Sequence, residues 1–127
     1  MIKIVIPLPP ITKKNSSRIL INKATGRPFV SPSQQYKDYE TQAGWYIKGK
    51  DRKHINAPVN IKCVFYMPTK RKVDLSNLIS AAMDILVRYG VIEDDNSEIV
   101  VSNDGSRVYY DKYNPRTEIF IEEAKQW

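Results

Sequence analysis

The sequence has few of the residues on which several common chemistries depend. Among its 127 residues there is one cysteine and one histidine. A single cysteine excludes an internal disulfide and a cysteine zinc cluster, and a single histidine gives little support to a His-centred triad or a His-rich zinc site. The five glycines are scattered, without a P-loop or a glycine-rich dinucleotide fingerprint. We therefore expect Cys63 to be a buried structural thiol and His54 to be a surface residue.

Long apolar runs are also missing. No stretch approaches the roughly 20 apolar residues that a membrane-spanning helix needs. The N-terminal "MIKIVIPLPP" lacks the apolar centre and cleavage site of a signal peptide. We therefore expect a cytoplasmic protein with no membrane partner. The composition, 42% hydrophobic and 27% charged, is ordinary for a globular chain, and the length predicts one domain over residues 1–127.

The charge that is present is mostly positive. A net charge of +6 favours a polyanionic partner, because lysines and arginines that neutralise phosphates release bound counterions. A basic composition alone does not separate nucleic-acid binding from a charged surface that only keeps the protein soluble.

The periodicity of polar and apolar residues, together with the turn residues, predicts the following order: a strand, a hairpin, a helix, a strand, a helix and two further strand regions. We expect strands over 2–6 and 59–67, a hairpin turning at "KATGR", and a helix over 34–49 that Ser33 caps. The last two strand regions are "EIVVSNDGSRVYYDKY", interpreted as a hairpin or bulged pair around Asn103–Gly105, and "TEIFIEEA". This order predicts an α/β (α+β) fold, a mixed β-sheet with two main helices packed on it.

The second helix is expected over residues 74–89. At about 100° per residue, apolar residues fall on one wide stripe: Leu75, Leu78, Ile79, Ala82, Ile85, Leu86 and Tyr89. The opposite face carries Asn77, Ser80, Asp84 and Arg88. Asp74 stands at the N-cap position, and Gly90 ends the helix.

This helix lies within "KRKVDLSNLISAAMDILVRYGVIEDD", which begins with three cationic residues and ends in three acidic ones. Carboxylate oxygens are ligands for Mg²⁺, and cationic side chains hold phosphates that the acids would repel. Metal-dependent cleavage of a phosphodiester requires this combination. The helix separates its own ends by about 24 Å, so the acids form one site only if tertiary packing brings them together.

Each of these residues also has a purely structural interpretation. Asp74 is explained equally by an N-cap role, and "EDDNSE" by a solvated turn. Asp84 is explained by a side chain facing water, and residues 70–72 by a solubilising loop.

Four stretches resemble the RusA family of Holliday-junction resolvases. They are "PLPPITKKN", "VSPSQQYKDYETQA", "KRKVDLSNLISAAMDIL" and "GVIEDDNSEI", in the family's order. The resemblance implies a homodimer of α/β subunits, found in bacteria and in phage-infected cells and common in prophages, that acts in DNA recombination and repair. Such a protein binds four-way DNA junctions and makes paired nicks with Mg²⁺, for which Mn²⁺ substitutes.

The resemblance also implies roles for individual residues. Asp74 and Asp95 match the metal-binding, catalytic acids, Asp94 matches the first acid of the terminal pair and is a further metal ligand, and Asp84 matches the catalytic helix aspartate. The residues expected to contact DNA are Lys13, Lys14, Asn15, Lys70, Arg71, Lys72 and Asn77.

Two positions depart from the family's pattern. Ser76 stands where the family often has a second aspartate, and Ser80 where it often has a lysine. The missing carboxylate weakens cation binding, and the missing lysine removes a group that stabilises charge on the phosphate. Three interpretations therefore stay open: a junction-resolving nuclease, a junction- or branched-DNA-binding protein with weak or no nuclease activity, and a basic surface that serves solubility only.

Overall fold

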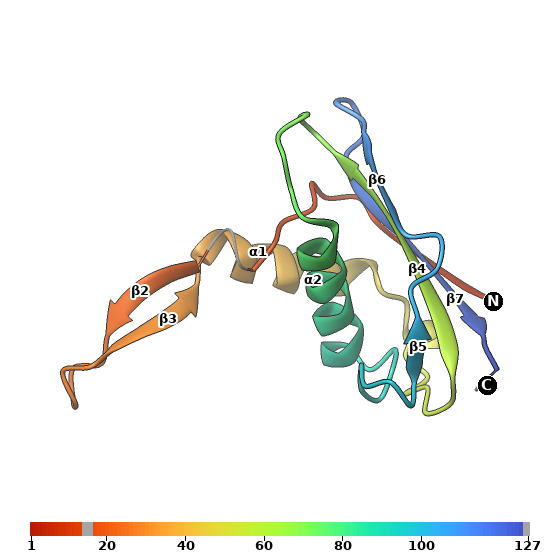
Figure 1. Cartoon of the computed structure of the whole chain (residues 1–127), viewed down its shortest axis with the longest axis horizontal. Coiled ribbons are helices and arrows are strands. Elements are labelled where there is room, and N and C mark those ends of the chain that lie inside the picture. The colour runs from red at the N-terminus through yellow and green to blue at the C-terminus, as the bar shows by residue number, and fades with distance from the viewer. Residues whose placement is uncertain (14–16, 126–127) are drawn as a thin grey trace.

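The centre of the molecule is a mixed five-stranded sheet, seen in a computed structural model that describes residues 1–13 and 17–125 (Figure 1). Its strands are β1 (Ile2–Ile6), β4 (Val59–Met67), β5 (Val100–Ser102), β6 (Arg107–Tyr110) and β7 (Arg116–Glu123). Strand β7 pairs antiparallel with β1 and β4, whereas β5 and β6 both pair parallel with β4. The predicted mixed sheet with two helices is confirmed.

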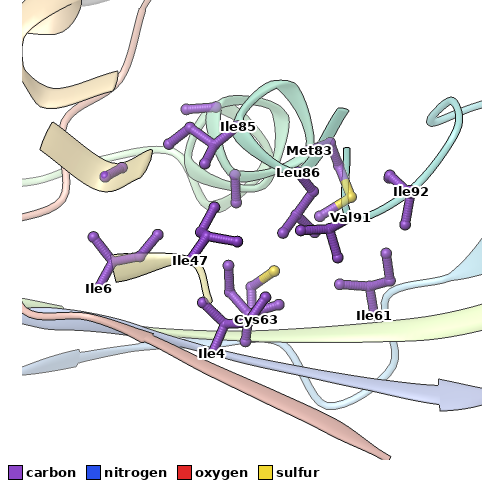
Figure 2. Close-up of a cluster of buried hydrophobic side chains, with 14 of the residues drawn as sticks. Ile4, Ile6, Ile47, Ile61, Cys63, Met83, Ile85, Leu86, Val91 and Ile92 are labelled. Carbon is purple, nitrogen blue, oxygen red and sulfur yellow. The ribbon is translucent and has the colours of Figure 1, made fainter. Parts of the chain in front are cut away.

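Strand β4 shows how the sheet builds the core. Its side chains alternate between two faces, and Ile61, Cys63 and Phe65 are buried on the face that the helices cover. Figure 2 shows Ile61 and Cys63 on the sheet side of the core, with Ile85 and Leu86 on the helix side. Burial raises the pKa of the Cys63 thiol to about 12, so Cys63 is the buried structural thiol that the sequence predicts.

Helix α2 (Leu75–Arg88) supplies most of the layer above the sheet, and its predicted bounds are correct to within one residue at each end. Its buried residues include most of the predicted stripe. Ala81 and Met83 are buried as well, whereas Leu75 at the start of the stripe is 36% exposed. Gly90 follows the helix with a φ of 73°, as a glycine at a helix C-terminus commonly has.

Helix α1 (Gln34–Ala43) begins as predicted, because the Ser33 hydroxyl accepts a hydrogen bond from the Tyr36 amide at 3.2 Å. The prediction that it continues to residue 49 is wrong. It is followed by two 3₁₀ turns, η2 (Gly44–Tyr46) and η3 (Gly49–Asp51). Gly44 is an unfavourable helix residue and lies so close to the Tyr89 ring that a Cβ there would come within 2.3 Å. Trp45 and Tyr46, which lie in η2 and not in a continued helix, are 73% and 41% exposed.

Strands β5 and β6 do not form the hairpin predicted around Asn103–Gly105, because both run parallel to β4 along the same edge. The Asn60 side chain fills the break between them: its Oδ1 accepts hydrogen bonds from the Asp104 amide at 2.8 Å and the Ser102 hydroxyl at 2.5 Å. The predicted turn around Asn103–Gly105 is present, but it interrupts an edge strand instead of reversing the chain.

The strands β2 (Ser17–Ile21) and β3 (Pro28–Pro32) form the predicted hairpin, a two-stranded sheet that extends away from the rest of the molecule (Figure 1). The Asn22 side chain accepts hydrogen bonds from the amides of Ala24 and Thr25. Gly26 has a φ of 69°, so this turn uses a conformation that favours glycine.

Candidate active site and nucleic-acid interface

Asp74 lies directly before α2, at the position that the sequence predicts. Its backbone carbonyl accepts hydrogen bonds from the amides of Asn77 and Leu78, which starts the helix. Its carboxylate, however, makes no capping hydrogen bond to the backbone. The Asp74 side chain is exposed, and its Oδ2 accepts a hydrogen bond from Nδ2 of Asn77 at 3.2 Å. The interpretation of this carboxylate as a helix cap therefore fails, and the carboxylate remains accessible to a ligand.

The first two turns of α2 hold the other residues of the motif. Asn77 is half-buried and orients the Asp74 carboxylate through the hydrogen bond described above. Ser76 and Ser80 are both exposed. The two departures from the family pattern therefore lie on the surface at the same end of α2 as Asp74.

The basic segment Lys70–Lys72 precedes Asp74 at this end of the helix. All three cationic side chains are exposed. Arg71 and Lys72 line an open cleft of about 600 Å³, whose other walls come from residues 9–12, Gln35 and residues 67–69. A cleft with cationic walls beside an exposed carboxylate suits a phosphate-bearing ligand.

Asp84 lies farther along α2, on the side that faces α1, and is half-buried. Partial burial raises the pKa of its carboxyl group, and the negative charges of Asp95 and Glu40 raise it further, whereas Lys13 lowers it. Glu40 also forms an ion pair with Arg88, one turn beyond Asp84. Asp84 is therefore only partly exposed to solvent, because the two helices pack against each other here.

The acidic turn that follows α2 uses its three acids differently. Glu93 lies 3.3 Å from Nδ1 of His54, an exposed histidine as predicted. The Asp94 carboxylate accepts hydrogen bonds from the Asp95 amide at 2.8 Å and from Nδ2 of Asn96 at 3.1 Å, and these bonds lower its pKa. Asp94 thus stabilises its own turn in ionised form. Asp95 is exposed and close enough to Asp84 for their charges to interact.

The predicted acids thus form two separate groups. Asp74 lies at one end of α2 with the basic segment, whereas Asp95 follows the other end and lies near Asp84 (Figure 1). Within residues 1–13 and 17–125, no three His, Cys, Asp or Glu side chains are grouped to hold a metal ion. The exposed carboxylates have the right chemistry for a hard divalent cation, but one protomer does not present Asp74 and Asp95 to the same ion.

The remaining predicted DNA contacts lie near the chain's N-terminal segment. Lys13 is exposed and lies near Asp84, at the side of α2 that faces α1. Lys14 and Asn15 fall outside the described residues.

Sequence reasoning missed an aromatic and basic surface formed by β4, β6 and β7, near the C-terminal end of β4. Tyr66 stacks on Tyr109 with ring centroids 5.4 Å apart, and Arg116 and Arg107 lie over these rings. The mixture of arginine, lysine and tyrosine in "RVYYDKY" indicates such a surface, but from the sequence we interpret this segment only as a strand.

Comparison with protein families matches residues 7–122 to the family described as "Endodeoxyribonuclease RusA". No curated protein matches the chain. Among the described residues, no helix is long and apolar enough to cross a membrane.

Proposed function

The chain belongs to the RusA family of endodeoxyribonucleases, and we propose that it resolves four-way DNA junctions by paired, metal-dependent nicking. One observation carries the proposal: the Asp74 carboxylate is exposed, has no capping role and lies beside three exposed cations. A surface acid of this kind would repel DNA unless neighbouring cations held the backbone. We extend the proposal to one RusA-like domain over residues 1–127, acting in recombination and repair in the cytoplasm of a bacterial or phage-infected cell.

The basic segment Lys70–Lys72 binds phosphates flanking the cleaved bond, and Lys13 contributes charge at the other group of acids. Such contacts position the DNA backbone without reading its sequence. Lys14 and Asn15, which fall outside the described residues, belong to the same proposal by their places in the sequence.

Asp74 and Asp95 would hold Mg²⁺, or Mn²⁺ in its place, with Asp94 completing the shell. When bound, such an ion neutralises charge on the phosphate and lowers the pKa of water that attacks it. Asn77 holds the Asp74 carboxylate in one orientation through its 3.2 Å hydrogen bond. Asp84, whose carboxylate interacts with the charge of Asp95, would complete or orient this shell.

Asp74 and Asp95 are separated within one protomer, and a homodimer would bring the two acids together at one site. We propose that a complete site combines Asp74 of one protomer with Asp95 of the partner subunit. Two protomers related by a two-fold axis would then form two such sites, which matches the paired nicks that a symmetric junction requires.

The experiment is cleavage of a synthetic four-way junction in Mg²⁺, compared with linear duplex and with EDTA. We expect symmetric nicks in the junction, no product in EDTA and little cleavage of the duplex. Junction binding without nicks at any Mg²⁺ or Mn²⁺ concentration would instead favour a second candidate function.

That second candidate is a junction- or branched-DNA-binding protein with little nuclease activity, and the exposed Ser76 and Ser80 favour it. It predicts salt-sensitive junction binding in EDTA. The double substitution Ser76→Asp with Ser80→Lys should then produce cleavage, since it adds the missing carboxylate and cation. If no DNA binding occurs even at low salt, the basic surface serves solubility only.

A further inference from the structure

Four side chains form a continuous row across three strands, on the sheet face opposite the helices. The strand register places Tyr66 of β4 beside Arg116 of β7 and Tyr109 of β6. The two tyrosine rings are 5.4 Å apart and inclined by 19°. The guanidinium carbon of Arg116 lies 3.7 Å from the Tyr66 ring centroid, and that of Arg107 lies 5.0 Å from the Tyr109 ring centroid. We call Arg116, Tyr66, Tyr109 and Arg107 the stacking ladder.

The two ends of the stacking ladder differ. Arg116 is held by Glu118 at 2.7 Å and by Asp111 at 3.2 Å, so its charge is balanced within the protein. At the other end, Tyr109 is 44% exposed and Arg107 is exposed. Among the described residues Arg107 forms no ion pair. One end of the ladder is therefore fixed, and the other offers a planar aromatic surface with an unbalanced cation.

Two more pairs of aromatic ring and cation lie at the end of β6 and in the turn that follows it, although Tyr110 points to the sheet face opposite that of Tyr109. Lys70 lies 5.3 Å from the Tyr110 ring centroid, and Lys112 lies 5.8 Å from that of Tyr113, which is 90% exposed. The Asp111 amide donates a hydrogen bond to the Met67 carbonyl at 2.9 Å, which ties the end of β6 to the end of β4. The segment from residue 68 to Asp74 starts at that point, so the aromatic surface lies at the Asp74 end of α2 (Figure 1).

We infer that the stacking ladder binds unpaired DNA bases on the sheet face opposite α2, at the end of the sheet where the segment leading to Asp74 begins, an inference that rests on the proposed function. Every base has a π-face, and successive bases stack on exposed aromatic rings and on guanidinium planes without sequence preference. Three cations form no ion pair within the part of the chain that the structure describes, and they complement the phosphates of the same strand: Lys70, Arg107 and Lys112. A branched DNA supplies unpaired bases where its strands part.

The charge of this surface argues against a protein partner. The buried core of a protein interface is depleted in charged residues. Here each exposed ring is paired with a cation instead: Tyr109 with Arg107, Tyr110 with Lys70, and Tyr113 with Lys112. A flexible polyanion with planar bases matches this alternation better than an apolar protein surface does.

The test is binding of a fluorescein-labelled single-stranded oligonucleotide, and of a blunt duplex of the same sequence, measured by anisotropy in EDTA. Loss of one stacking contact in Tyr109→Leu should weaken single-strand binding roughly ten-fold and duplex binding much less. Tyr109→Phe keeps the ring and should bind as the wild type does. The matched control is Tyr46→Leu, an equally exposed tyrosine beside β1 at the opposite edge of the sheet.

Arg107→Ala keeps the inference testable if Tyr109→Leu does not fold, because the Arg107 side chain is exposed. It should weaken single-strand binding and reduce the slope of log affinity against log salt by about 0.7, the value for one phosphate contact on a single strand. Wild-type single-strand affinity in both Tyr109→Leu and Arg107→Ala would overturn the inference. An equal loss in Tyr46→Leu would also overturn it, as would a changed oligomeric state of Tyr109→Leu, which would make this face a protein contact.

This inference and the proposed function fail in different ways. If the wild type nicks no junction in Mg²⁺ while Tyr109→Leu still loses single-strand affinity, the ladder stands and the nuclease assignment falls. If junctions are nicked and all Tyr109 and Arg107 variants bind single strands normally, the nuclease assignment stands and the ladder falls.

Discussion

Asp74 lies directly before α2, whereas Asp95 follows the helix and lies near Asp84, about 15 Å along the helix from Asp74. One protomer cannot offer both carboxylates to a single cation in this arrangement. If both acids are required for cleavage, two protomers must meet so that each contributes one acid to each site.

Complementation between two inactive variants tests this composite site. We expect Asp74→Asn and Asp95→Asn to be inactive as separate proteins, because each lacks one acid in both sites. After the two are mixed and allowed to exchange subunits, a heterodimer has one site with both acids and one with neither. Junction nicking should therefore return, on one strand per junction instead of two.

The control for this mixture is Asp74→Asn combined with the double variant Asp74→Asn/Asp95→Asn, in which no site has both acids. If the first mixture is as inactive as this control although subunits exchange, the two acids act within one protomer and the composite site is wrong.

Asp84 should make stability depend on pH in a defined direction. Burial raises its pKa in the folded state, so the folded protein binds the proton more tightly than the unfolded chain does. The ionised Asp84 carboxylate therefore destabilises the folded protein. This destabilisation is absent below the ordinary aspartate pKa, grows as pH rises, and is complete above the raised pKa. Asp84→Asn should thus unfold at a higher temperature than the wild type at neutral pH, but not at pH 3. The groups facing Asp84 are Lys13, Asp95, Glu40 and Tyr36, and both proteins contain all four.

Asp94 should change the stability of the protein with pH in the direction opposite to Asp84. Hydrogen bonds from the Asp95 amide and Asn96 lower its pKa, so its stabilisation is present above the ordinary aspartate pKa and is lost as pH falls. Asp94→Asn should lower the unfolding temperature at neutral pH, and the difference should vanish in acid. The same direction for both variants would contradict the surroundings assigned to these two carboxyl groups.

Gly44 should tolerate no side chain, because the Tyr89 ring occupies the space that a Cβ needs. Gly44→Ala should lower the free energy of unfolding by about 1–3 kcal/mol, the usual cost of overpacking. The control is Gly49→Ala, where no atom lies within 4 Å of an added Cβ. Urea unfolding of both variants checks this, and an equal effect would contradict the contact between Gly44 and Tyr89.

Ser76 should be a position at which metal affinity can be increased. A carboxylate in Ser76→Asp adds one negative charge two residues after Asp74, so half-maximal junction cleavage should occur at a lower Mg²⁺ concentration. Ser80→Asp is the matched control, since it makes the same exchange about one turn farther from Asp74. An unchanged Mg²⁺ requirement in Ser76→Asp would show that residue 76 does not face the ion.

The parts of this structure that depend on local pattern could be predicted from the sequence. The spacing of Leu78, Ile85 and Leu86 indicates the buried side of α2, and Gly90 indicates its end. The end of α1 was mispredicted because it depends on Tyr89, a residue far along the chain that packs on Gly44.

The environment of the site depends on such distant contacts throughout. The sequence places Asp84 on the polar side of α2, but only the packing of α1 shows that Glu40 faces it. The Tyr66–Tyr109 stack requires a parallel pairing of β6 with β4, whereas the turn signal at Asn103–Gly105 favoured a hairpin. The positions of Asp74 before α2 and of Asp95 after it were therefore predictable, whereas the packing of α1 against Asp84 was not.

The most direct test of the nuclease assignment is nicking of a four-way junction in Mg²⁺ by the wild type, Asp74→Asn, Asp95→Asn and Asp38→Asn. Asp38 is an exposed acid of α1 outside both acidic groups and serves as the matched control. We expect the wild type and Asp38→Asn to cut the junction, and each of the other two to lose at least roughly 10–100-fold in rate, as even residues behind a metal ligand do when changed. Cleavage that both Asp74→Asn and Asp95→Asn leave unchanged would contradict the proposed active site.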